Sequence, residues 1–524
     1  MSKRLRLLIA LFASLCLSNC SSLSTPAIAK NSNKIKNVIL IIGDGMGAQQ
    51  VGLLLSYARQ APHSVLPTRQ TAFDRLLTDG ELGLSLTYAA NTLVTDSAAS
   101  ASQLATGQAA RIEMLGMDKD GKTAQTLVET AQRLGKATGL VSDTRITHAT
   151  PAGFAAHQNH RRQENEIAQD LLKTNADVML SAGLSYWLPQ QVNQPSAIQT
   201  QWQQRLTIKP VSKRKDDKDL LSSAEQQGYQ LVFNREQLNQ ANGKLLGLFA
   251  NEEMQDAITE RYHPQKTQPS LAEMSLKALQ TLDKNPNGFF LMIEAGQIDW
   301  AGHHNDTGLL LHEMLKANET INSVLDWLGS REDTLLIVTA DHETGGFGFS
   351  YSAYQIPAAQ TLPSNAQYKP NFNFGNPAIL DQLYLQQRSH HQLFQDFDAL
   401  PKTQQTAEQL VLMVNQDSEF HINEKQAERI LATEKNPYYY PEHEYLGLKE
   451  VPKMEGNTAF FPYQKTNREN LLAQALANQQ QAVWATGSHT STPVYVFAKG
   501  GLNSNFQKIL HHTELGRLIM KALQ

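Results

Sequence analysis

The sequence predicts an α/β protein with a large, mostly parallel central sheet and helices on both faces. Three unbroken apolar runs end abruptly in glycine or acidic residues, and helical stretches separate them, which is typical of buried parallel strands. The runs are Asn37–Ile42, Phe289–Ile293 and Leu335–Ala340. Ligands of such sheets bind beyond the carboxyl ends of the strands. A functional site is therefore expected where Asp44, Glu294 and Asp341 follow these runs.

Composition limits the class of protein. The chain has 524 residues, of which 41% are hydrophobic and 18% charged, as is ordinary for a soluble globular protein with a sizeable core. Its length predicts one large α/β unit with insertions or two domains. The formal charge of -4 gives no sign of a nucleic-acid-binding surface, and the mixed-charge run 212–219 is interpreted as a solvated loop.

The N-terminus has the pattern of an export signal. Basic residues precede an apolar run, Leu7–Leu17, that is too short to span a bilayer. The small-x-small pattern that ends at Ala29 predicts a signal peptide over 1–29 and a periplasmic or secreted protein. The alternative is a lipoprotein signal that ends before Cys20, with a lipid anchor in the outer membrane. Because Cys16 and Cys20 are the chain's two cysteines, the exported body has no disulfide, and its core and metals must hold it together.

Changes in composition predict the domain organisation. Residues 351–480 are rich in Gln, Asn and Tyr, and the core pattern resumes with Trp484–Lys499. We therefore predict a catalytic α/β domain over 30–350 and 481–524, with 351–480 as an inserted, crown-like or surface subdomain. A second stretch rich in Gln and charge, 186–250, is interpreted as a smaller addition.

The run Gly43–Ala48 fits a dinucleotide-binding fingerprint after a strand. That interpretation expects an acidic residue about 20 positions further on to hold a ribose. None occurs between Asp44 and Asp74, and export argues against a nicotinamide enzyme. The competing interpretation is that Asp44, flanked by glycines at a strand end, presents its carboxylate to a metal.

Other residues have the chemistry of metal ligands. Asp299 and His303 are four apart, so on a helix they share one face, a spacing suited to two ligands of one ion. An exposed polar helix start with incidental histidines is the alternative. Asp341 and His342 can both turn to one ion from a loop, unless Asp341 merely caps a helix. His489, in a loop before another strand, is a weak signal alone.

Together these residues suit two kinds of ion. Nitrogen-plus-carboxylate sets favour zinc, and all-oxygen sets of Asp, Thr and Glu favour magnesium. Two ions about 4 Å apart can hold the attacking and leaving oxygens of an in-line displacement at phosphorus. A serine bound to one of them loses its proton to the field of the metal and needs no histidine nearby in the sequence.

One stretch contains such a serine. The run Val94–Gly107 places Ser97, Ser100 and Ser102 among residues with little bulk. Thr95 or Asp96 can start a helix whose N-terminal amides and dipole face a bound phosphate. Ser97 is then the candidate nucleophile, and the other two serines are small residues that let the helix pack closely on the sheet.

Six motifs resemble those of the alkaline phosphatase family in order and spacing. The resemblance covers essentially all of 35–350 and 481–520. The motifs are Gly43–Gly47, Thr95–Ser100, His148–Pro151, Glu294–His303, Asp341–Gly345 and Gly487–Thr490.

The resemblance implies a role for each matching residue. Ser97 is the nucleophile that becomes a phosphoserine. The cofactors implied are two zinc ions and one magnesium ion. The first zinc is held by Asp299, His303 and His489, the second by Asp44, Asp341 and His342, and the magnesium-type site by Asp44, Thr150 and Glu294.

Arg161 matches the arginine that binds two phosphate oxygens, as a guanidinium suits a dianion; Arg162 beside it is the alternative register. Asp96 then orients Arg161. His148 and Trp300 stand where some members have an aspartate and a lysine, although other members carry His and Trp. His148 is therefore expected to change the affinity of the third site for magnesium.

The expected function is nonspecific hydrolysis of small phosphate monoesters at alkaline pH, and the resemblance suggests a homodimer. A phosphodiesterase should lack an arginine such as Arg161. A sulfatase motif needs proline and arginine at positions where this chain has Ala99 and Ala101. A surface protein that only binds metal would be expected to have lost Ser97 or Arg161.

Overall fold

A computed structural model describes residues 35–524 of the chain, except 263–265, 444, 456–458 and 462–465. The predicted signal peptide, residues 1–29, and its candidate lipidation site Cys20 lie outside the described residues. Residues 35–524 form a single compact unit.

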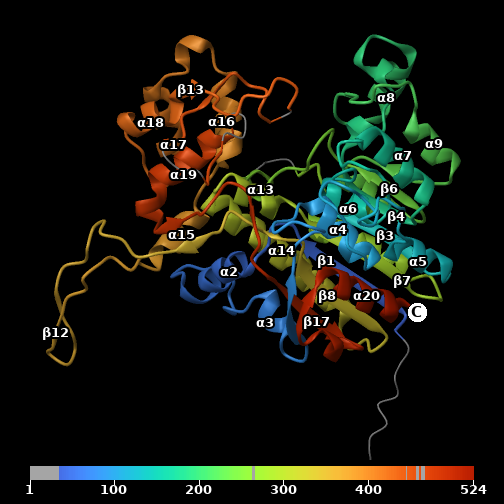
Figure 1. The fold of residues 1–524 in the computed structure, drawn as a ribbon, viewed down its shortest axis with the longest axis horizontal. Helices are drawn as coiled ribbons and strands as arrows, with labels where there is room; N and C mark the ends of the chain where they lie inside the picture. Colours follow the sequence, from blue (N-terminus) through green and yellow to red (C-terminus); the bar gives the residue numbers. More distant parts are fainter. Residues whose placement is uncertain (1–34, 263–265, 444, 456–458, 462–465) are drawn as a thin grey trace, which may run out of the picture. The chain divides into compact units, whose positions relative to one another are not determined.

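A ten-stranded sheet, in the order β18-β2-β17-β8-β1-β7-β3-β4-β6-β5, is the centre of the fold (Figure 1). Only β17 is antiparallel to its neighbours, β8 and β2, and the other pairs of this sheet are parallel. The predicted large, mostly parallel sheet is therefore confirmed. The strands are β1 Asn37–Gly43, β2 Glu81–Leu86, β3 Ala137–Arg145, β4 Val178–Ala182, β5 Gln230–Val232, β6 Leu245–Leu248, β7 Phe289–Ala295, β8 Thr334–Ala340, β17 Val494–Gly500 and β18 Ile509–His511.

The three apolar runs identified in the sequence are β1, β7 and β8, and they are adjacent. In the parallel register Gly43 pairs with Ala295 of β7 and with Ala340 of β8. All residues of these three strands are buried. The residues that follow β1 and β8 therefore reach the same edge of the sheet as the end of β7.

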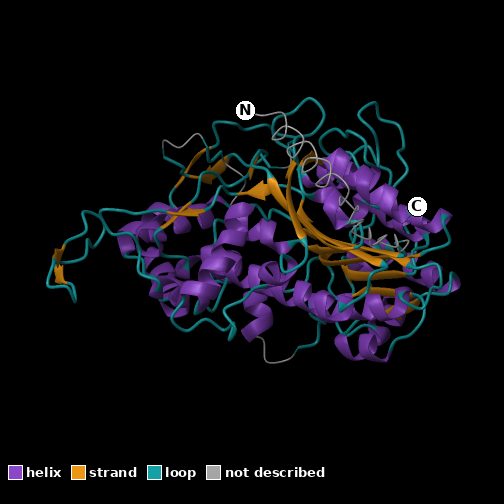
Figure 2. Ribbon diagram, turned by 90° about the horizontal axis from the view of Figure 1, so that it is seen from below, coloured by secondary structure: helices purple, strands orange, loops and turns teal. Residues whose placement is uncertain are grey.

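Helices cover both faces of the sheet (Figure 2). Because side chains alternate along a strand, Ile39 and Ile41 of β1 join one hydrophobic cluster and Leu40 and Ile42 join another. Helices α2 Ala48–Gln60, α12 Leu271–Leu282 and α14 Thr307–Leu328 contribute to the first cluster. Helices α4 Ser97–Thr106, α5 Leu127–Arg133, α7 Glu164–Thr174 and α20 His512–Leu523 contribute to the second.

Shorter elements complete this part of the chain. The helices are α3 Ala72–Leu76, α6 Ala149–Gly153, α8 Ala197–Arg205, α9 Leu220–Gln226, α10 Arg235–Gln240, α11 Ala257–Tyr262 and α13 Gln297–His303. Small two-stranded sheets pair β10 Gly348–Phe349 with β15 Ala482–Val483, and β9 Glu343–Thr344 with β16 His489–Thr490. The second pair joins the chain after Asp341 to the loop of His489.

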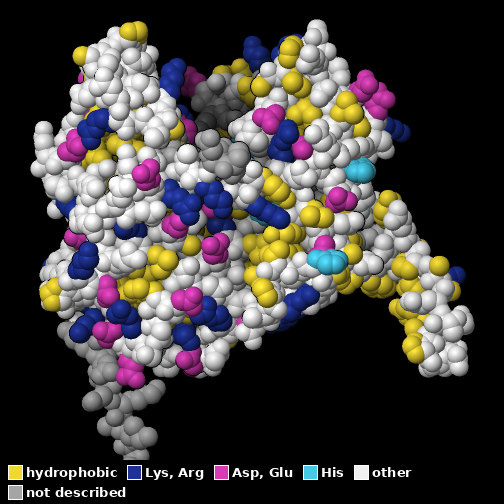
Figure 3. Space-filling view, turned by 180° about the vertical axis from the view of Figure 1, so that it is seen from behind, with side chains coloured by type: hydrophobic (Ala, Val, Ile, Leu, Met, Phe, Trp, Pro, Cys, Tyr) yellow, Lys and Arg dark blue, Asp and Glu magenta, His cyan; other side chains and the backbone are white. Residues whose placement is uncertain are grey.

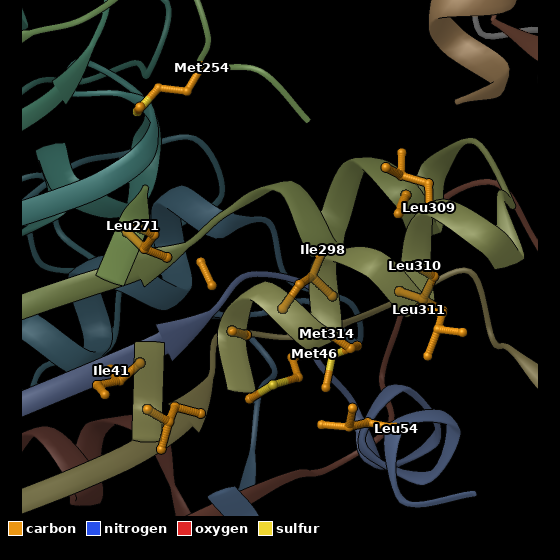
Figure 4. Close-up of a cluster of buried hydrophobic side chains, with 14 of the residues drawn as sticks. Ile41, Met46, Leu54, Met254, Leu271, Ile298, Leu309, Leu310, Leu311 and Met314 are labelled. Atoms are coloured by element: carbon orange, nitrogen blue, oxygen red, sulfur yellow. The ribbon is translucent and has the colours of Figure 1, made fainter. Parts of the chain in front are cut away.

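A buried methionine fixes the loop that follows β1. Met46 is 3% exposed and belongs to the same hydrophobic cluster as Ile41, Ile298 and Met314. Figure 4 shows Met46 lying close to Ile298 of α13 and Met314 of α14. This packing holds the backbone of Asp44, two residues earlier, in one position against α13.

The main regular elements in the described part of residues 351–480 are five α-helices, and they share the core of the first face. Buried side chains of this region, among them Leu383, Phe394 and Leu472, belong to the same hydrophobic cluster as β1. The predicted division at 350/351 and 480/481 stays a prediction. The elements are β11 Gln360–Thr361, β12 Gln367–Tyr368, α15 Ala378–Tyr384, α16 His390–Ala399, α17 Ala407–Asp417, α18 Glu424–Leu431, β13 Thr433–Lys435, β14 Glu450–Pro452 and α19 Asn467–Gln480.

No helix in the described part of the chain combines the length and the apolarity that a membrane crossing requires.

Candidate active site

The carboxyl edge of β1, β7 and β8 brings three acidic residues together. Asp44, Glu294 and Asp341 are all fully buried. The backbone N–H of Asp44 donates to the carbonyl of Ala295 at 3.1 Å, and that of Gly45 donates to Oδ1 of Asp341 at 3.1 Å. These bonds connect the loops after the strands, so the carboxylates are positioned by backbone rather than by flexible side chains.

One group of candidate ligands contains Asp44, Asp341 and His342, whose ligand atoms lie within 4.8 Å of one another. His342 Nε2 is 3.2 Å from Asp341 Oδ2 and 3.5 Å from Asp44 Oδ1. Burial, and then the negative charge of neighbouring carboxylates, raises the pKa of both aspartates. Burial also lowers the pKa of His342, so the neutral imidazole that a metal binds is favoured.

A second group contains Asp299, His303 and His489. The two imidazole Nε2 atoms lie 3.2 Å apart, and they are 3.3 and 3.5 Å from the carboxylate oxygens of Asp299. His303 Nδ1 lies 2.7 Å from the carbonyl of Gly487, and His489 Nδ1 lies 2.9 Å from that of Thr95. A carbonyl only accepts, so each Nδ1 carries a proton, and Nε2 of the neutral ring is then the atom that can bind an ion.

The third group contains Asp44, His148 and Glu294. Thr150 donates its hydroxyl to Asp44 Oδ2 at 3.3 Å, and His148 Nδ1 is 3.8 Å from Glu294 Oε1. Thr144 donates a hydrogen bond of 2.9 Å to Glu294 Oε2, the other oxygen of this carboxylate. The structure thus brings Thr150 and His148 to the same pair of carboxylates.

Ser97 is the first residue of α4 and is 2% exposed. Asp96 is the N-cap of this helix, because its side chain accepts from the N–H of Ala99 at 3.0 Å. The Ser97 hydroxyl lies 3.2 Å from His342 Nε2. A histidine is therefore near the serine in space although none is near in sequence, and the same nitrogen faces Asp44 and Asp341.

The other serines of the stretch pack α4 against its neighbours. Ser100 donates to the carbonyl of Asp341 at 2.9 Å, and Ser102 donates to that of Met114 at 3.0 Å. Every residue of α4 is buried, so small side chains are needed at this helix.

Arg161 lies beside Ser97, between two predicted site residues. Its Nη1 donates to Asp96 Oδ2 at 3.2 Å, and its Nη2 is 3.1 Å from His148 Nε2. Burial alone would lower the pKa of Arg161, but the negative charges of Asp96 and Asp44 outweigh it and raise the pKa. Arg162 instead places its guanidinium 5.2 Å from the centre of the Tyr445 ring. Trp300 meets the ring of His148 edge-on at 6.0 Å.

A cavity of about 910 Å³ opens over these groups. Ser97, Arg161, His303 and His489 line one side of it. Residues of the predicted insert, among them His391, Gln395, Tyr445 and Asn470, line it as well. Both parts of the chain therefore line the cavity.

The family model of alkaline phosphatase matches residues 35–524. The chain belongs to the alkaline phosphatase family. It is 28% identical to alkaline phosphatase 3 of Bacillus subtilis over 537 aligned residues, 98% of this chain and 96% of that protein. The crystal structure of Thermus thermophilus alkaline phosphatase superposes with a TM-score of 0.74 and 26% identity, covering 94% of this chain and 91% of that chain.

A histidine-to-aspartate mutant of TAB5 alkaline phosphatase, with Mg bound in its M3 site, shares the fold at a TM-score of 0.59 and 22% identity, covering 94% of this chain and 98% of that chain. The protein is accordingly a phosphatase hydrolase of this family, and fold and family support hydrolysis of phosphate monoesters. The role of each candidate residue stays a prediction.

Some members of the site were not singled out from the sequence. Glu343 is buried, accepts from Gln50 Nε2 at 2.8 Å and from Thr490, and so ties α2 to the loop of His489. Asn470 of α19 contacts the backbone of His303. Glu343 adjoins Asp341 and His342, which was a usable signal, whereas nothing in the sequence marks Asn470.

Proposed function

We propose that this alkaline phosphatase hydrolyses phosphate monoesters through a phosphoserine at Ser97, with two zinc ions and a third, magnesium-type ion. The observation that carries the proposal is the placement of the Ser97 hydroxyl at the N-terminus of α4, 3.2 Å from His342 Nε2 and beside Arg161. Nothing else in the described residues combines a nucleophile, a phosphate-binding cation and three groups of metal-binding side chains.

Buried oxygens without partners support the metal sites. Among the described residues, Asp44 Oδ1, Asp341 Oδ2 and Glu294 Oε1 are buried and accept no hydrogen bond. Such carboxylate oxygens are costly unless a cation neutralises them. We assign the first zinc to Asp299, His303 and His489, the second to Asp44, Asp341 and His342, and the third ion to Asp44, Thr150 and Glu294. When bound, zinc supplies Lewis-acid charge at phosphoryl oxygens and lowers the pKa of a coordinated hydroxyl group.

The chain's own residues bind and orient the substrate. Arg161, held by Asp96, donates two parallel N–H groups to two oxygens of the phosphate dianion. The N-terminal amides of α4 face the same phosphate. Ser97 Oγ then forms a bond to phosphorus while the bond to the leaving alcohol oxygen breaks and that oxygen takes a proton. Water attacks the phosphoserine in the second step, phosphate leaves, and Ser97 recovers its proton.

The third site differs from an all-oxygen site because His148 shares it with Asp44 and Glu294. Magnesium prefers oxygen ligands, whereas imidazole nitrogen suits zinc. Replacing the imidazole with a carboxylate, His148→Asp, is therefore expected to strengthen magnesium binding, as measured by the concentration that restores activity after chelation. A weaker response to magnesium in this variant would contradict the assignment.

The experiment on the central proposal uses the purified protein and an aryl phosphate monoester. We expect phosphate release, loss of activity with a chelator and recovery with zinc. Ser97→Ala should abolish the phosphoenzyme trapped by acid quench, and Ser102→Ala, on the same helix, should retain it. Full activity of Ser97→Ala would refute the mechanism. A diester hydrolysed faster than the monoester would instead favour the phosphodiesterase alternative.

We also propose that the protein forms a homodimer. The chain on either side of the β11–β12 hairpin carries exposed aromatic residues, including Tyr351, Tyr354 and Phe374, and Figure 3 shows hydrophobic side chains along this extended segment. Apolar surface of this kind is typical of an interface, and a second copy is the occupant we propose. Light scattering should give twice the monomer mass, and removal of 353–371 should reduce it; a monomeric wild type would overturn the proposal.

Export to the periplasm or the medium is proposed from the N-terminal pattern alone. Sensitivity of processing to globomycin, or incorporation of labelled lipid at Cys20, would identify an outer-membrane lipoprotein. Processing that ignores globomycin and cleaves after Ala29 would support the soluble form.

A further inference from the structure

Two histidines and a glutamate meet on the rim of the cavity, outside the three groups described above. His304 follows α13 directly, His391 lies in α16 and Glu469 lies in α19 (Figure 1). One ligand atom of each lies within 4.8 Å of those of the other two. The imidazole rings of His304 and His391 are nearly parallel, with an interplanar angle of 4° and centres 4.8 Å apart.

Two atoms in this cluster are buried without hydrogen-bond partners among the described residues. They are Nδ1 of His304 and Oε2 of Glu469. The Glu469 side chain is 4% exposed, and its other oxygen lies 3.4 Å from Nδ1 of His391. Buried polar atoms without partners are unfavourable, and a cation bound to this cluster would remove part of that cost.

The surroundings of His391 fit a metal ligand. Its second ring nitrogen, Nε2, lies 2.8 Å from the side-chain amide of Gln395. The two ends of an amide are interchangeable by rotation, so the side-chain oxygen of Gln395 can accept a hydrogen bond from Nε2–H when Nδ1 holds a cation. Such an outer hydrogen bond orients most metal-bound histidines.

The segment that carries Glu469 is held in place on both sides. Arg468 makes a bidentate ion pair with Asp398 of α16, at 2.8 and 3.0 Å. Asn470 donates to the carbonyl of His303 at 2.8 Å. Glu469 is thus fixed relative to both helices that supply the histidines, and the cluster needs no rearrangement of backbone to bind an ion.

We propose that His304, His391 and Glu469 bind a further divalent metal ion of the zinc class, separate from the catalytic ions. Two imidazoles and one carboxylate are an N₂O ligand set that suits zinc better than magnesium or calcium. His391 and His304 line the cavity, so the remaining coordination position faces solvent. Because the three ligands come from the end of α13, from α16 and from α19, the ion joins the predicted insert to the helix of His303.

The test is metal content. The wild type, His391→Ala and Glu469→Gln are dialysed against a zinc buffer, and zinc per chain is measured by mass spectrometry. Each variant should hold one equivalent less than the wild type. His421→Ala, which removes an exposed histidine of the same region, is the control and should keep the full number.

A second readout covers the case in which a variant is poorly folded. Hydrogen exchange in α16 and α19 should slow when zinc is added to wild type stripped of metal, and this effect should be smaller in Glu469→Gln, which preserves side-chain size. Equal zinc content in wild type and both variants would overturn the proposal. Loss of more than one equivalent would overturn the claim that the site is separate from the catalytic ions.

Discussion

The side-chain amide of Asn470 donates to the carbonyl oxygen of His303 and to Oδ1 of Asn305, both at 2.8 Å. Asn305 in turn donates to the carbonyl of Thr486 at 2.9 Å, in the loop that leads to His489. One side chain of α19 therefore connects the backbone positions of two predicted ligands of the same zinc. Residues 351–480 contribute no proposed catalytic group, yet Asn470 fixes the backbone next to those ligands.

Asn470→Ala should weaken zinc binding at the site of His303 and His489. The substitution leaves a buried carbonyl without its donor, a cost of about 1–3 kcal/mol, which corresponds to about 5- to 150-fold in affinity. Competition with a fluorescent chelator measures the change. Asn478→Ala, at an exposed position of the same helix, is the matched control, and equal zinc affinity in the two variants would contradict this role for Asn470.

Arg161→Ala should lower kcat/KM for a phosphate monoester far more than Arg162→Ala. Arg161 is the arginine paired with Asp96, whereas Arg162 stacks near Tyr445. A charge-assisted bidentate contact contributes about 1.5–3 kcal/mol, so the expected loss is on the order of 10- to 100-fold. Inhibition by inorganic phosphate should weaken in parallel. A larger loss in Arg162→Ala would assign the phosphate to the alternative register.

Gly45→Ala should inactivate the enzyme, whereas Gly121→Ala should not. Both glycines have positive φ, +71° and +75°, so an alanine has similar backbone strain at each position. A Cβ at Gly45 would lie 2.7 Å from Cα of Asp299, while a Cβ at Gly121 meets nothing within 4 Å. The difference between the variants isolates displacement of Asp299. Rates of monoester hydrolysis and unfolding midpoints of both variants test this prediction. Similar activity of the two variants would contradict the explanation.

Glu313→Gln should remove part of the pH dependence of stability. Burial raises the pKa of Glu313 to about 8, although Lys316, at 2.6 Å, opposes the shift. The pKa of this carboxyl is higher in the folded than in the unfolded chain, so the folded state is favoured while the group is protonated in both states. This contribution to stability is lost as the pH rises from the unfolded pKa towards 8. The variant should therefore gain stability relative to the wild type between about pH 4.5 and 8, by at most about 1.4 kcal/mol per pH unit.

Urea unfolding of both proteins across this pH range measures the difference, and a stability gap that does not change with pH would contradict the assignment. Lys316→Met provides the contrast. It leaves the carboxylate of Asp143 buried without its cation, and breaking a buried pair in this way costs about 3–5 kcal/mol.

The sequence was most informative where candidate ligand residues stand at the end of a predicted strand. Three apolar runs predicted three strands, and because the strands are parallel neighbours, Asp44, Glu294 and Asp341 had to meet. The spacing of Asp299 and His303 likewise predicted that both side chains would lie on one face of a helix. In the structure Asp299 Oδ2 and His303 Nε2 are 3.3 Å apart.

Contacts between distant segments could not be predicted in this way. The approach of His342 to Ser97, 245 residues apart, depends on how α4 packs at the end of β8. Asn470 and Glu469 lie in a polar helix whose sequence has no motif, and only tertiary packing brings them to α13. His304 stands beside His303 in the sequence, but nothing in the sequence indicates that His391 would lie near it.

Asp44 belongs to two of the candidate metal groups, one with Asp341 and His342 and one with His148 and Glu294. A carboxylate shared between two ions makes their binding free energies interdependent. This coupling is reciprocal. If an ion at the first site changes the affinity of the second site by some factor, an ion at the second site changes the affinity of the first by the same factor. Metal titrations of this protein should accordingly be described by a cooperative isotherm, and substitution of Asp44 should abolish the coupling along with both affinities.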